Sequence, residues 1–455
     1  MAPGETVTEP SAQLLSLPGR LQEHEGFCEV VAGLRAGAAA TLDGAWGSAC
    51  ALAAAALGEH APGPLVVVCP RVDDVDEVSD DLRLFAAQTP EIFPAWESMP
   101  GESRAQDGIS GDRTRVLKLL QGPQPPKLVI ASIQALLQPV PDPESLARNT
   151  RTLRVGTEID LGELAHWLAE HGFHGTTAVA LPGEMAIRGG ILDLFAADWH
   201  DPVRVEFFGD RIESIRRFEV SSQRSLGQWE AVDLSVIDGT VASRGHLASY
   251  VPRSGWFFLI EPQELEEHAR HYVERLDRPG EVHDFPAVME QVARFGSVTA
   301  SAMATGALGT VCRLGVESVE RFSGDLGKVR EELDAAGENQ EVFVVCQTEA
   351  EVRRLSELFG STRLAREGRL RFPIGRLGHG FRMVREQIAL VSSGELFHRA
   401  DLRRTAPRRL SRPIDSFMEL REGSLVVHVG HGIARYRGME LLRKEQQVEE
   451  HLALE

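Results

Sequence analysis

The chain has 455 residues, more than one hydrophobic core organises, and at ~150 residues per domain it suggests about three domains. Its 43% hydrophobic and 25% charged residues are ordinary for a soluble globular protein and exclude a disordered or fibrous chain. The formal net charge of -19 at pH 7 excludes non-specific wrapping of nucleic acid, because phosphates are held by Lys and Arg.

The amino terminus and the cysteines indicate a cytoplasmic protein with no membrane contact. MAPGETVTEP has neither a basic segment nor an apolar one, and the small-apolar run at 49–57 is too short to span a bilayer. The cysteines are scattered and odd in number, which favours buried free thiols over disulfides or a metal site: Cys28, Cys50, Cys69, Cys312 and Cys346.

Strand and helix patterns alternate in the first part of the chain. PLVVVCP (64–70) and KLVIAS (127–132) are apolar, β-branched runs typical of buried strands, and 72–85 has the spacing of a helix. A Pro/Gly-rich loop at 93–102 precedes a second helical pattern at 109–122. This alternation predicts an α/β domain with a parallel sheet.

The later elements change in character along the chain. The patterns predict a helix at 160–173, a hairpin around a Gly-Asp turn within 203–220, and a strand leading into a helix at 256–276. A further α/β unit is predicted at 326–359, with a strand at 387–393. The Arg- and Pro-rich stretch 401–415 reads as a linker, and the Gly-punctuated 423–442 as part of a small barrel.

The stretch DGAWGSACALAAAALG (43–58) has the outline of a phosphate-binding loop that opens a helix. Gly44 and Gly47 supply loop glycines, but Cys50 and Ala51 stand where GxxxxGK[ST] requires Lys and Ser/Thr. A helix N-terminus still favours an anion, yet charge neutralisation and metal ligation are lost. We interpret the stretch as a degenerate phosphate loop, predict no ATP hydrolysis at it, and name no catalytic residue.

Two groups of polar residues have spacings that could bind a metal, but we interpret both as structural. Glu264, His268 and His271 share one helical face, and we interpret that face as solvated, so no metal site is predicted. His428 and His431 alternate along a strand-like segment, where packing is the better interpretation. Glu261 at a strand end is too common a feature to carry a function alone.

The segment 184–218 combines apolar alternation with arginines and aromatics, residue types that are enriched at interfaces. Its arginines are Arg188, Arg204, Arg211, Arg216 and Arg217, and its aromatics include Phe195, Trp199, Phe207, Phe208 and Phe218. Two interpretations stay open: a binding surface, or a sheet with aromatics in the core and arginines on its wet face.

The run MAIRGGILDLF…VRVEFFGDRIESIRRFEVSSQRSL (185–226) closely resembles a segment shared by the excinuclease B subunit and the transcription-repair coupling factors. FPAWESMPGE, ISGDRTRVLKLLQG and VVHVGHGIARYRGMELL resemble the coupling-factor family in particular. The resemblance implies an α/β multidomain fold with a P-loop-like but degenerate parallel-sheet domain. It also implies an inserted α+β docking subdomain, a second small α/β domain and a partial SH3-like β-barrel.

The resemblance implies six segments along the chain. The excinuclease-B-like α/β domain comes in two parts, at 1–138 and 227–318, around a docking subdomain at 139–226. A small α/β domain follows at 319–400, then a linker at 401–416 and an incomplete RNA polymerase-interaction barrel at 417–455. Because a half-barrel leaves strand edges unpaired, we expect the last segment to be poorly stable alone.

The family implies two partners, the excinuclease A subunit and the RNA polymerase β subunit. Arg188 matches the arginine of the family's RG pattern, and Phe173 and His174 match an aromatic-arginine pair in which His replaces the arginine. The docking candidates are completed by Arg204, Phe208 and Arg211, and the polymerase candidates are Ile433, Tyr436 and Leu442. We expect Arg188 to be accessible in the free chain.

In the family, ATP and Mg²⁺ serve a DNA translocase that follows the barrel, and DNA is held mainly there. That region is absent from these 455 residues, so we expect no cofactor in this chain and regard it as an amino-terminal part or a truncated gene product. The alternatives are an excinuclease-B-type ATPase or helicase in damage recognition, and a standalone adaptor or gene fragment.

Overall fold

The computed structural model describes residues 12–96, 108–236, 245–304, 310–319, 322–397, 425–428, 432–444 and 447–454. The chain divides into two compact units, Met1–Asp401 and Leu402–Glu455. Within the described ranges, no helix has both the length and the apolar character needed to cross a bilayer.

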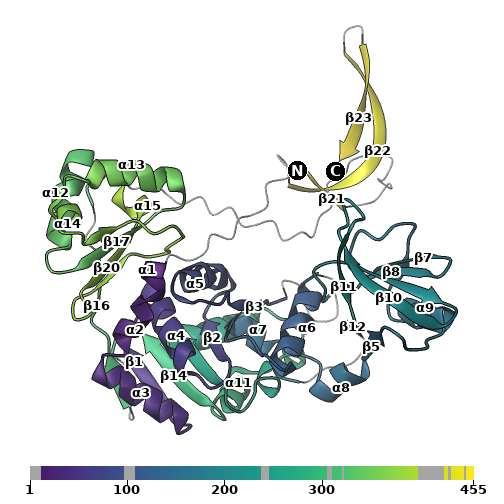
Figure 1. Ribbon diagram of the computed structural model, residues 1–455, viewed down its shortest axis with the longest axis horizontal. Coiled ribbons are helices and arrows are strands. Elements are labelled where there is room, and N and C mark those ends of the chain that lie inside the picture. Colours follow the sequence, from purple (N-terminus) through teal and green to yellow (C-terminus); the bar gives the residue numbers. More distant parts are fainter. Residues whose placement is uncertain are drawn as a thin grey trace. The chain divides into compact units, whose positions relative to one another are not determined.

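A seven-stranded sheet, in which all paired strands are parallel, forms the centre of the larger unit (Figure 1). In spatial order its strands are β15 (Thr310–Arg313), β1 (Ala39–Asp43), β14 (Gly296–Ser301), β13 (Trp256–Ile260), β2 (Leu65–Cys69), β4 (Leu128–Ser132) and β3 (Glu91–Phe93). Every residue of β2 and β4 is buried, as expected for strands covered on both faces. The predicted α/β class with a parallel sheet is confirmed.

Helices cover the two faces of this sheet with two separate cores. One core takes side chains from α1 (Ala12–Leu15), α2 (Leu17–Leu21), α3 (Glu25–Arg35), α4 (Ser48–His60) and α5 (Val72–Phe85). The other takes them from α6 (Gly108–Gln121), α7 (Ile133–Leu137), α8 (Pro143–Arg148), α10 (Pro262–Glu274) and α11 (Phe285–Val292). Two short 3-10 helices, η1 (Leu247–Ser249) and η2 (Pro279–Glu281), lie in connections of this domain. Helix α5 has the bounds predicted from its spacing.

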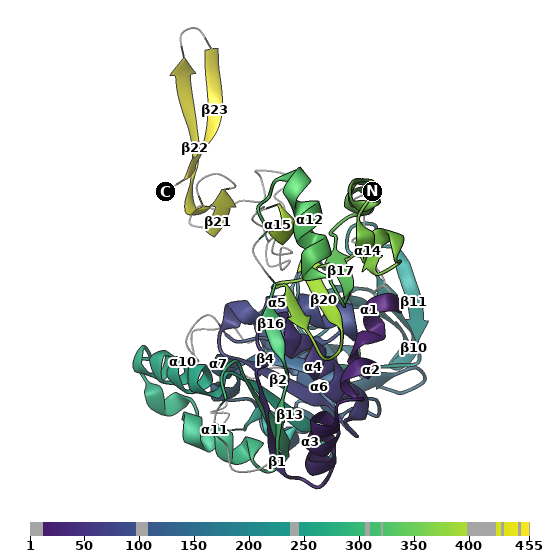
Figure 2. The same cartoon turned by 90° about the vertical axis from the view of Figure 1, so that its left-hand side faces the viewer.

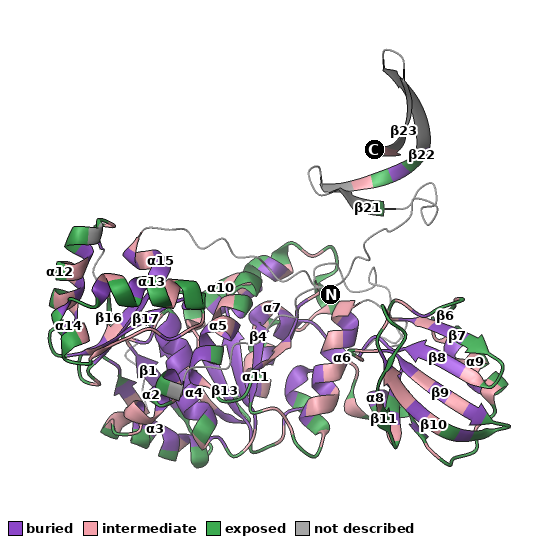
Figure 3. Cartoon of the chain, turned by 45° about the horizontal axis from the view of Figure 1, so that its top comes forward, coloured by how far each residue is buried: buried purple, intermediate pink, exposed green. Residues whose placement is uncertain are grey.

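A subdomain inserted between α8 and η1 is built on a six-stranded sheet. Its order is β11 (Ser225–Trp229), β10 (Arg211–Phe218), β9 (Val203–Phe208), β8 (Ile191–Phe195), β7 (Glu184–Arg188) and β6 (His174–Gly175), with β6–β7 the one parallel pair. Burial alternates along β9 of this sheet (Figure 3), whereas β2 of the central sheet is buried at every residue. The predicted hairpin is confirmed, since β9 and β10 pair across Gly209 at φ 59°.

The inserted subdomain continues past residue 226, which is the boundary expected from the resemblance. Strand β12 (Ala231–Ser235) pairs antiparallel with β5 (Thr150–Arg154), so the chain leaves the subdomain beside its entry point. Helix α9 (Leu161–Glu170) packs its apolar side on the six-stranded sheet, where Leu164 and Leu168 join the core formed by Leu192 and Val205.

A second, small α/β domain contains a mixed five-stranded sheet. Its order is β16 (Val316–Ser318), β19 (Phe381–Met383), β20 (Ile388–Ser392), β17 (Glu341–Val345) and β18 (Leu370–Arg371). Its helices are α12 (Leu326–Ala336), α13 (Glu349–Phe359), α14 (Arg363–Arg366) and α15 (Ser393–Leu396). The predicted unit at 326–359 is confirmed by α12, β17 and α13, while β16 begins before the expected start at 319.

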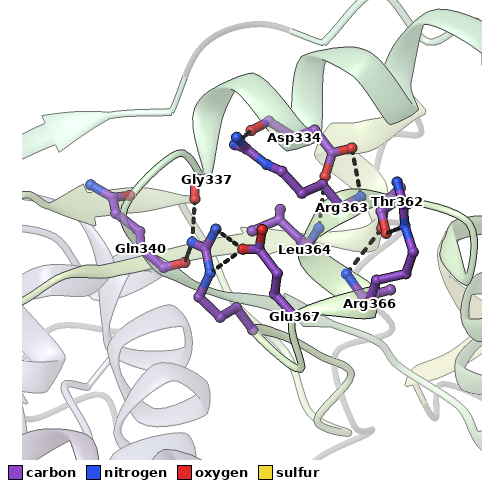
Figure 4. Close-up of polar contacts among 10 residues, drawn as sticks. Asp334, Gly337, Gln340, Thr362, Arg363, Leu364, Arg366 and Glu367 are labelled. Carbon is purple, nitrogen blue, oxygen red and sulfur yellow. Dashed lines mark hydrogen bonds and ion pairs between the residues drawn. The ribbon is translucent and has the colours of Figure 1, made fainter.

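Backbone capping orders the α12–β17 side of the small domain, as Figure 4 shows. The Asp334 carboxylate accepts hydrogen bonds from the backbone amides of Arg363, at 2.8 Å, and Leu364, at 2.9 Å. Thr362 caps α14 through the Ala365 amide, and the Arg369 guanidinium donates to the carbonyl of Gln340 at 2.7 Å. These bonds join the end of α12 to the start of α14.

The small domain packs on the α1–α5 side of the central sheet, and Figure 2 shows its strands β16, β17 and β20 on the same side of the molecule as α1, α4 and α5. Phe343, Leu377 and Phe381 of the small domain belong to the same buried core as α4 and α5. The Arg20 side chain of α2 pairs with Glu341 of β17. The two α/β domains therefore share one hydrophobic core.

The smaller unit contains a three-stranded antiparallel sheet of β21 (Leu425–His428), β22 (Gly432–Lys444) and β23 (Gln447–Leu454). These strands agree with the strand-like pattern at 423–442. The predicted linker at 401–416 lies outside the described residues.

Candidate functional sites: a filled glycine loop and an open sheet face

The loop between β1 and α4 keeps the backbone shape that its glycines allow. Gly44 has φ 80° and Gly47 has φ 51°, conformations that L side chains rarely adopt. A Cβ added to Gly44 would overlap the carbonyl oxygen of Leu314, and the Gly44 amide donates to the Ser301 carbonyl at 2.7 Å. Both glycines therefore serve the packing of the loop.

The two positions that would need Lys and Ser/Thr lie in the core. Cys50 and Ala51 are each 1% exposed and join the core beneath α4. Burial raises the pKa of the Cys50 thiol, with smaller contributions from the charges of Glu261 and Asp81. A thiol in this setting stays protonated, so it is neither a nucleophile nor a metal ligand at neutral pH.

A segment of the small domain, Leu377 to Gly380, lies against this loop. The His379 amide donates to the Ser48 hydroxyl at 2.8 Å, and the Gly378 amide donates to the Asp81 carboxylate at 2.8 Å. A Cβ added to Gly47 would lie 3.2 Å from the Cβ of His379. The start of α4, where a phosphate would bind in an intact loop, thus faces residues of the same chain. We call residues 377–380 the clip.

Two titratable groups hold the clip in place. Burial raises the pKa of Asp81 to about 7, while hydrogen bonds from Gly378 and Ser48 act in the opposite direction. The imidazole Nδ1 of His379 lies 2.7 Å from a Glu77 carboxylate oxygen, and this hydrogen bond raises the His379 pKa. The clip is therefore tied to α5 by a buried acid and a partly exposed ion pair.

Glu261 lies between β13 and α10 and has a left-handed backbone conformation, with φ 48°. Its carboxylate accepts from the Ala302 amide at 2.7 Å and from the Ser301 hydroxyl at 3.2 Å. These bonds join β13 to the end of β14, so the acid has a structural role at this edge of the sheet.

The face of the six-stranded sheet opposite α9 carries most of the predicted docking residues. We call it the open face, and by the strand register it includes Arg188, Ile191, Arg204, Glu206, Phe208 and Arg216. One end of it is covered by a small cluster of Val179, Ala186, Phe195 and Phe218. The remainder lies around the β7–β8 and β9–β10 turns.

Three of the predicted docking residues are exposed around these turns. Arg188 is exposed, as expected, and its guanidinium donates to the carbonyl of Thr177. Phe208 is 78% exposed, and it pairs with the exposed Arg211 across the β9–β10 turn. A large exposed ring beside an arginine is unfavourable in water and well suited to a protein contact.

Arg204 has a structural partner inside the subdomain. Its guanidinium forms two hydrogen bonds with the Asp193 carboxylate, at 2.7 and 2.8 Å, and lies 4.8 Å from the centroid of the Phe218 ring. The Asp193 side chain is only 4% exposed. Arg204 therefore neutralises a buried acid, and its predicted docking role stays a prediction.

The predicted aromatic-arginine equivalent, Phe173 and His174, is divided between core and surface. His174 is exposed in β6, but Phe173 is 3% exposed and packs in the core with α9. Phe173 follows the last turn of α9, where its ring closes that core. Phe173 consequently positions the exposed strand and does not itself present a surface.

The polymerase candidates all lie on β22. Tyr436 is 5% exposed within the smaller unit. The side chains of Ile433 and Leu442 lie outside what the structure describes.

The histidine pair of α10 lies at the edge of a cavity. His268 and His271 line it together with Arg71, Tyr272 and Arg275. Among the described residues, no cluster of three or more His, Cys, Asp or Glu side chains has the geometry to hold a metal ion. All five cysteines are free, and only Cys28 is exposed.

Two families have sequence patterns that match this chain. The UvrB interaction domain matches residues 152–236, which span the inserted subdomain from β5 to β12. The CarD-like/TRCF RID domain matches residues 420–455.

Several similar proteins are transcription-repair-coupling factors. The one from Escherichia coli (strain K12) is 26% identical over 92% of this chain, and the one from Bacillus subtilis (strain 168) is 22% identical over 93%. The one from Mycobacterium tuberculosis (strain CDC 1551 / Oshkosh) is 36% identical over 39% of the chain and 15% of its own length. The chain spans 44% of the E. coli and B. subtilis proteins, less than half of their length.

Proposed function

Because the chain corresponds to the amino-terminal region of the transcription-repair-coupling factors, with a UvrB interaction domain and the start of a CarD-like/TRCF RID domain, we propose that it is a docking module. It recruits the excinuclease A subunit in nucleotide excision repair and contacts the β subunit of a stalled RNA polymerase. ATP hydrolysis and DNA translocation by the whole protein reside in a part of the family that these residues do not include.

The exposed part of the open face carries this proposal. Arg188, Phe208 and Arg211 combine two guanidinium groups with one large ring at neighbouring turns, and these residue types dominate interface hot spots. The face belongs to the part of the chain that matches the UvrB interaction domain. The excinuclease B subunit shares this segment by resemblance, so both proteins should compete for one surface of the excinuclease A subunit.

The filled glycine loop supports a docking role over an ATPase role in this region. An ATP phosphate at the start of α4 would have to displace the clip, whose two backbone amides are bonded to Ser48 and Asp81. It would meet neither a lysine nor a metal-binding hydroxyl at Cys50 and Ala51. We infer that this domain supports the docking subdomain and hydrolyses no nucleotide.

The RNA polymerase contact would be made by the smaller unit, whose three antiparallel strands β21, β22 and β23 lie within the segment that matches the CarD-like/TRCF RID domain. Ile433, Tyr436 and Leu442 remain the candidates, all on β22.

Binding of the chain to the excinuclease A subunit tests the proposal. Replacing Arg188 by Ala is expected to weaken the complex by about 1 to 4 kcal/mol, because the lost guanidinium is a central contact. The thermal stability of the free chain should be almost unchanged, since Arg188 is exposed. The matched control is Arg353→Ala, an exposed arginine on α13 of the small domain, which should bind as the unaltered chain does.

Arg204→Ala serves in the same assay as a variant that loses folding stability together with binding. It leaves the Asp193 carboxylate buried without its partner, so it should lower stability by about 3 kcal/mol as well as binding. No complex with the unaltered chain, an intact complex with Arg188→Ala, or no competition by the excinuclease B subunit would each contradict the proposed surface.

A further inference from the structure

A cavity of about 460 Å³ opens at the carboxyl edge of the central sheet, away from the glycine loop. It lies beyond the ends of β2 and β4, since Pro70 and Arg71 follow β2 and Ile133 follows β4. Its size falls in the range of small-ligand pockets. None of the residues 43–51 lines it.

The topology of the sheet places a crevice at this point. After β2 the chain passes into α5, whose side chains belong to the core on one face, and after β4 it passes into α7 in the core on the other face. Adjacent parallel strands whose connections leave to opposite faces leave a crevice at their carboxyl ends, where α/β proteins bind ligands. The cavity occupies this switch point.

The walls of the cavity present hydrogen-bond donors above an apolar floor. Ile133, which is 1% exposed, and the ring of Tyr272, which is 8% exposed, form part of the floor. Helix α10 contributes His268 and His271, whose ring centroids lie 6.4 Å apart, and the following Arg275. Guanidinium groups donate and never accept, so they match a ligand that supplies acceptor oxygens.

Of the charged residues that line the cavity, Arg275 is the principal candidate to bind an anion. Arg71 is held by Asp74, with its NH2 group 2.9 Å from a carboxylate oxygen, and this hydrogen bond raises the Arg71 pKa. Asp73 is the one acid on the lining and restricts the ligand to the α10 side. Within the described part of the chain, no ion pair involves Arg275, which lines the cavity and is exposed.

We propose that this crevice binds the phosphate of a small phosphorylated ligand, with Arg275 and His268 as donors and the Tyr272 ring and Ile133 against its apolar part. A planar guanidinium fork fits phosphate oxygens, and a floor with an aromatic ring fits a sugar or a base. The site is separate from the open face and from the glycine loop, so the ligand would bind whether or not the chain engages a repair partner.

Titration of the whole chain with inorganic phosphate and with adenosine 5′-monophosphate, followed by calorimetry, tests this site. We expect saturable binding of both probes, tighter for the monophosphate. Arg275→Ala and His268→Ala should each weaken it at least tenfold without a change in melting temperature. Arg278→Ala is the matched control, because this exposed arginine just past α10 pairs with Glu281 and lies outside the lining.

Four results would overturn the inference. The first is no binding of either probe at millimolar concentration, and the second is binding that both the Arg275 and His268 variants retain. The third is Arg275-dependent binding of an oligonucleotide without terminal phosphates, with none of the monophosphate, because it would assign the site to a nucleic-acid backbone. Binding that is lost in Ser48→Ala but kept in Arg275→Ala would place the ligand at the glycine loop and also refute the site.

Discussion

The glycine loop after β1 and the open face of the inserted sheet differ in whether residues of the same chain cover them. At the loop, the glycines keep their positive-φ backbone, and the clip lies against it through one amide hydrogen bond to Ser48 and a second to Asp81 of α5. On the open face the side chains of Arg188 and Phe208 are exposed, and these are the residues that we propose to contact a partner. The contrast teaches that a loop can keep positive-φ glycines for packing alone, whereas a binding surface is recognised by exposed side chains.

Substitution of Gly44 is the largest effect that we predict from this contrast. Gly44→Ala should destabilise the chain by about 3 kcal/mol or more, because the left-handed backbone and an overlap with the Leu314 carbonyl act together. Gly189→Ala in the β7–β8 turn is the control. It also has positive φ, at 62°, but has open space around it and should cost about 1 to 2 kcal/mol.

Thermal unfolding of the two glycine variants measures the difference. Equal losses of unfolding free energy in Gly44→Ala and Gly189→Ala would mean that the loop after β1 is not tightly packed. The contrast between the filled loop and the open face would then fail.

A smaller effect is expected from the pH dependence of the clip. The folded pKa of Asp81, about 7, lies above its usual value of ~3.9, so between these values the folded chain keeps a proton that the unfolded chain has released. The unfolding free energy therefore falls as the pH rises through this window. His379, whose pKa is also raised, acts in the same direction as its proton is lost.

Asp81→Asn keeps an acceptor for the Gly378 amide but cannot ionise, so it should melt above the unaltered chain at about pH 8, by a few degrees, with the gap closing toward about pH 5. Asp80→Asn, at the preceding and more exposed position of α5, is the control. Parallel melting curves for Asp81→Asn and the unaltered chain at all pH values would show that Asp81 carries no such shift.

Local patterns predicted the elements well, while contacts between distant segments could not be predicted. Helix α5 and the β9–β10 hairpin follow from spacing and from a Gly-Asp turn, which act over a few residues. The clip joins Ser48 to His379 across 331 positions, and neither residue has a motif that announces the contact. Phe173 could have been assigned to the core only by knowing that α9 folds back over the sheet.

The histidines of α10 illustrate a different limit. Their helical spacing is visible in the sequence, and it predicts only that they share one face of a helix, which we interpret as solvated. Their cavity exists because α10 lies beside Arg71 and Ile133, residues that follow other strands of the sheet. Strand order therefore determines the site, and strand order is not encoded in any local pattern.

Amide hydrogen exchange of the whole chain with and without the excinuclease A subunit tests the central claim most directly. We predict protection confined to the turns of the open face, at 187–191 and 206–211, with exchange at 43–51 and 377–380 unchanged. Protection at the glycine loop and the clip, with none at the two turns, would contradict the claim that this chain works through its open face.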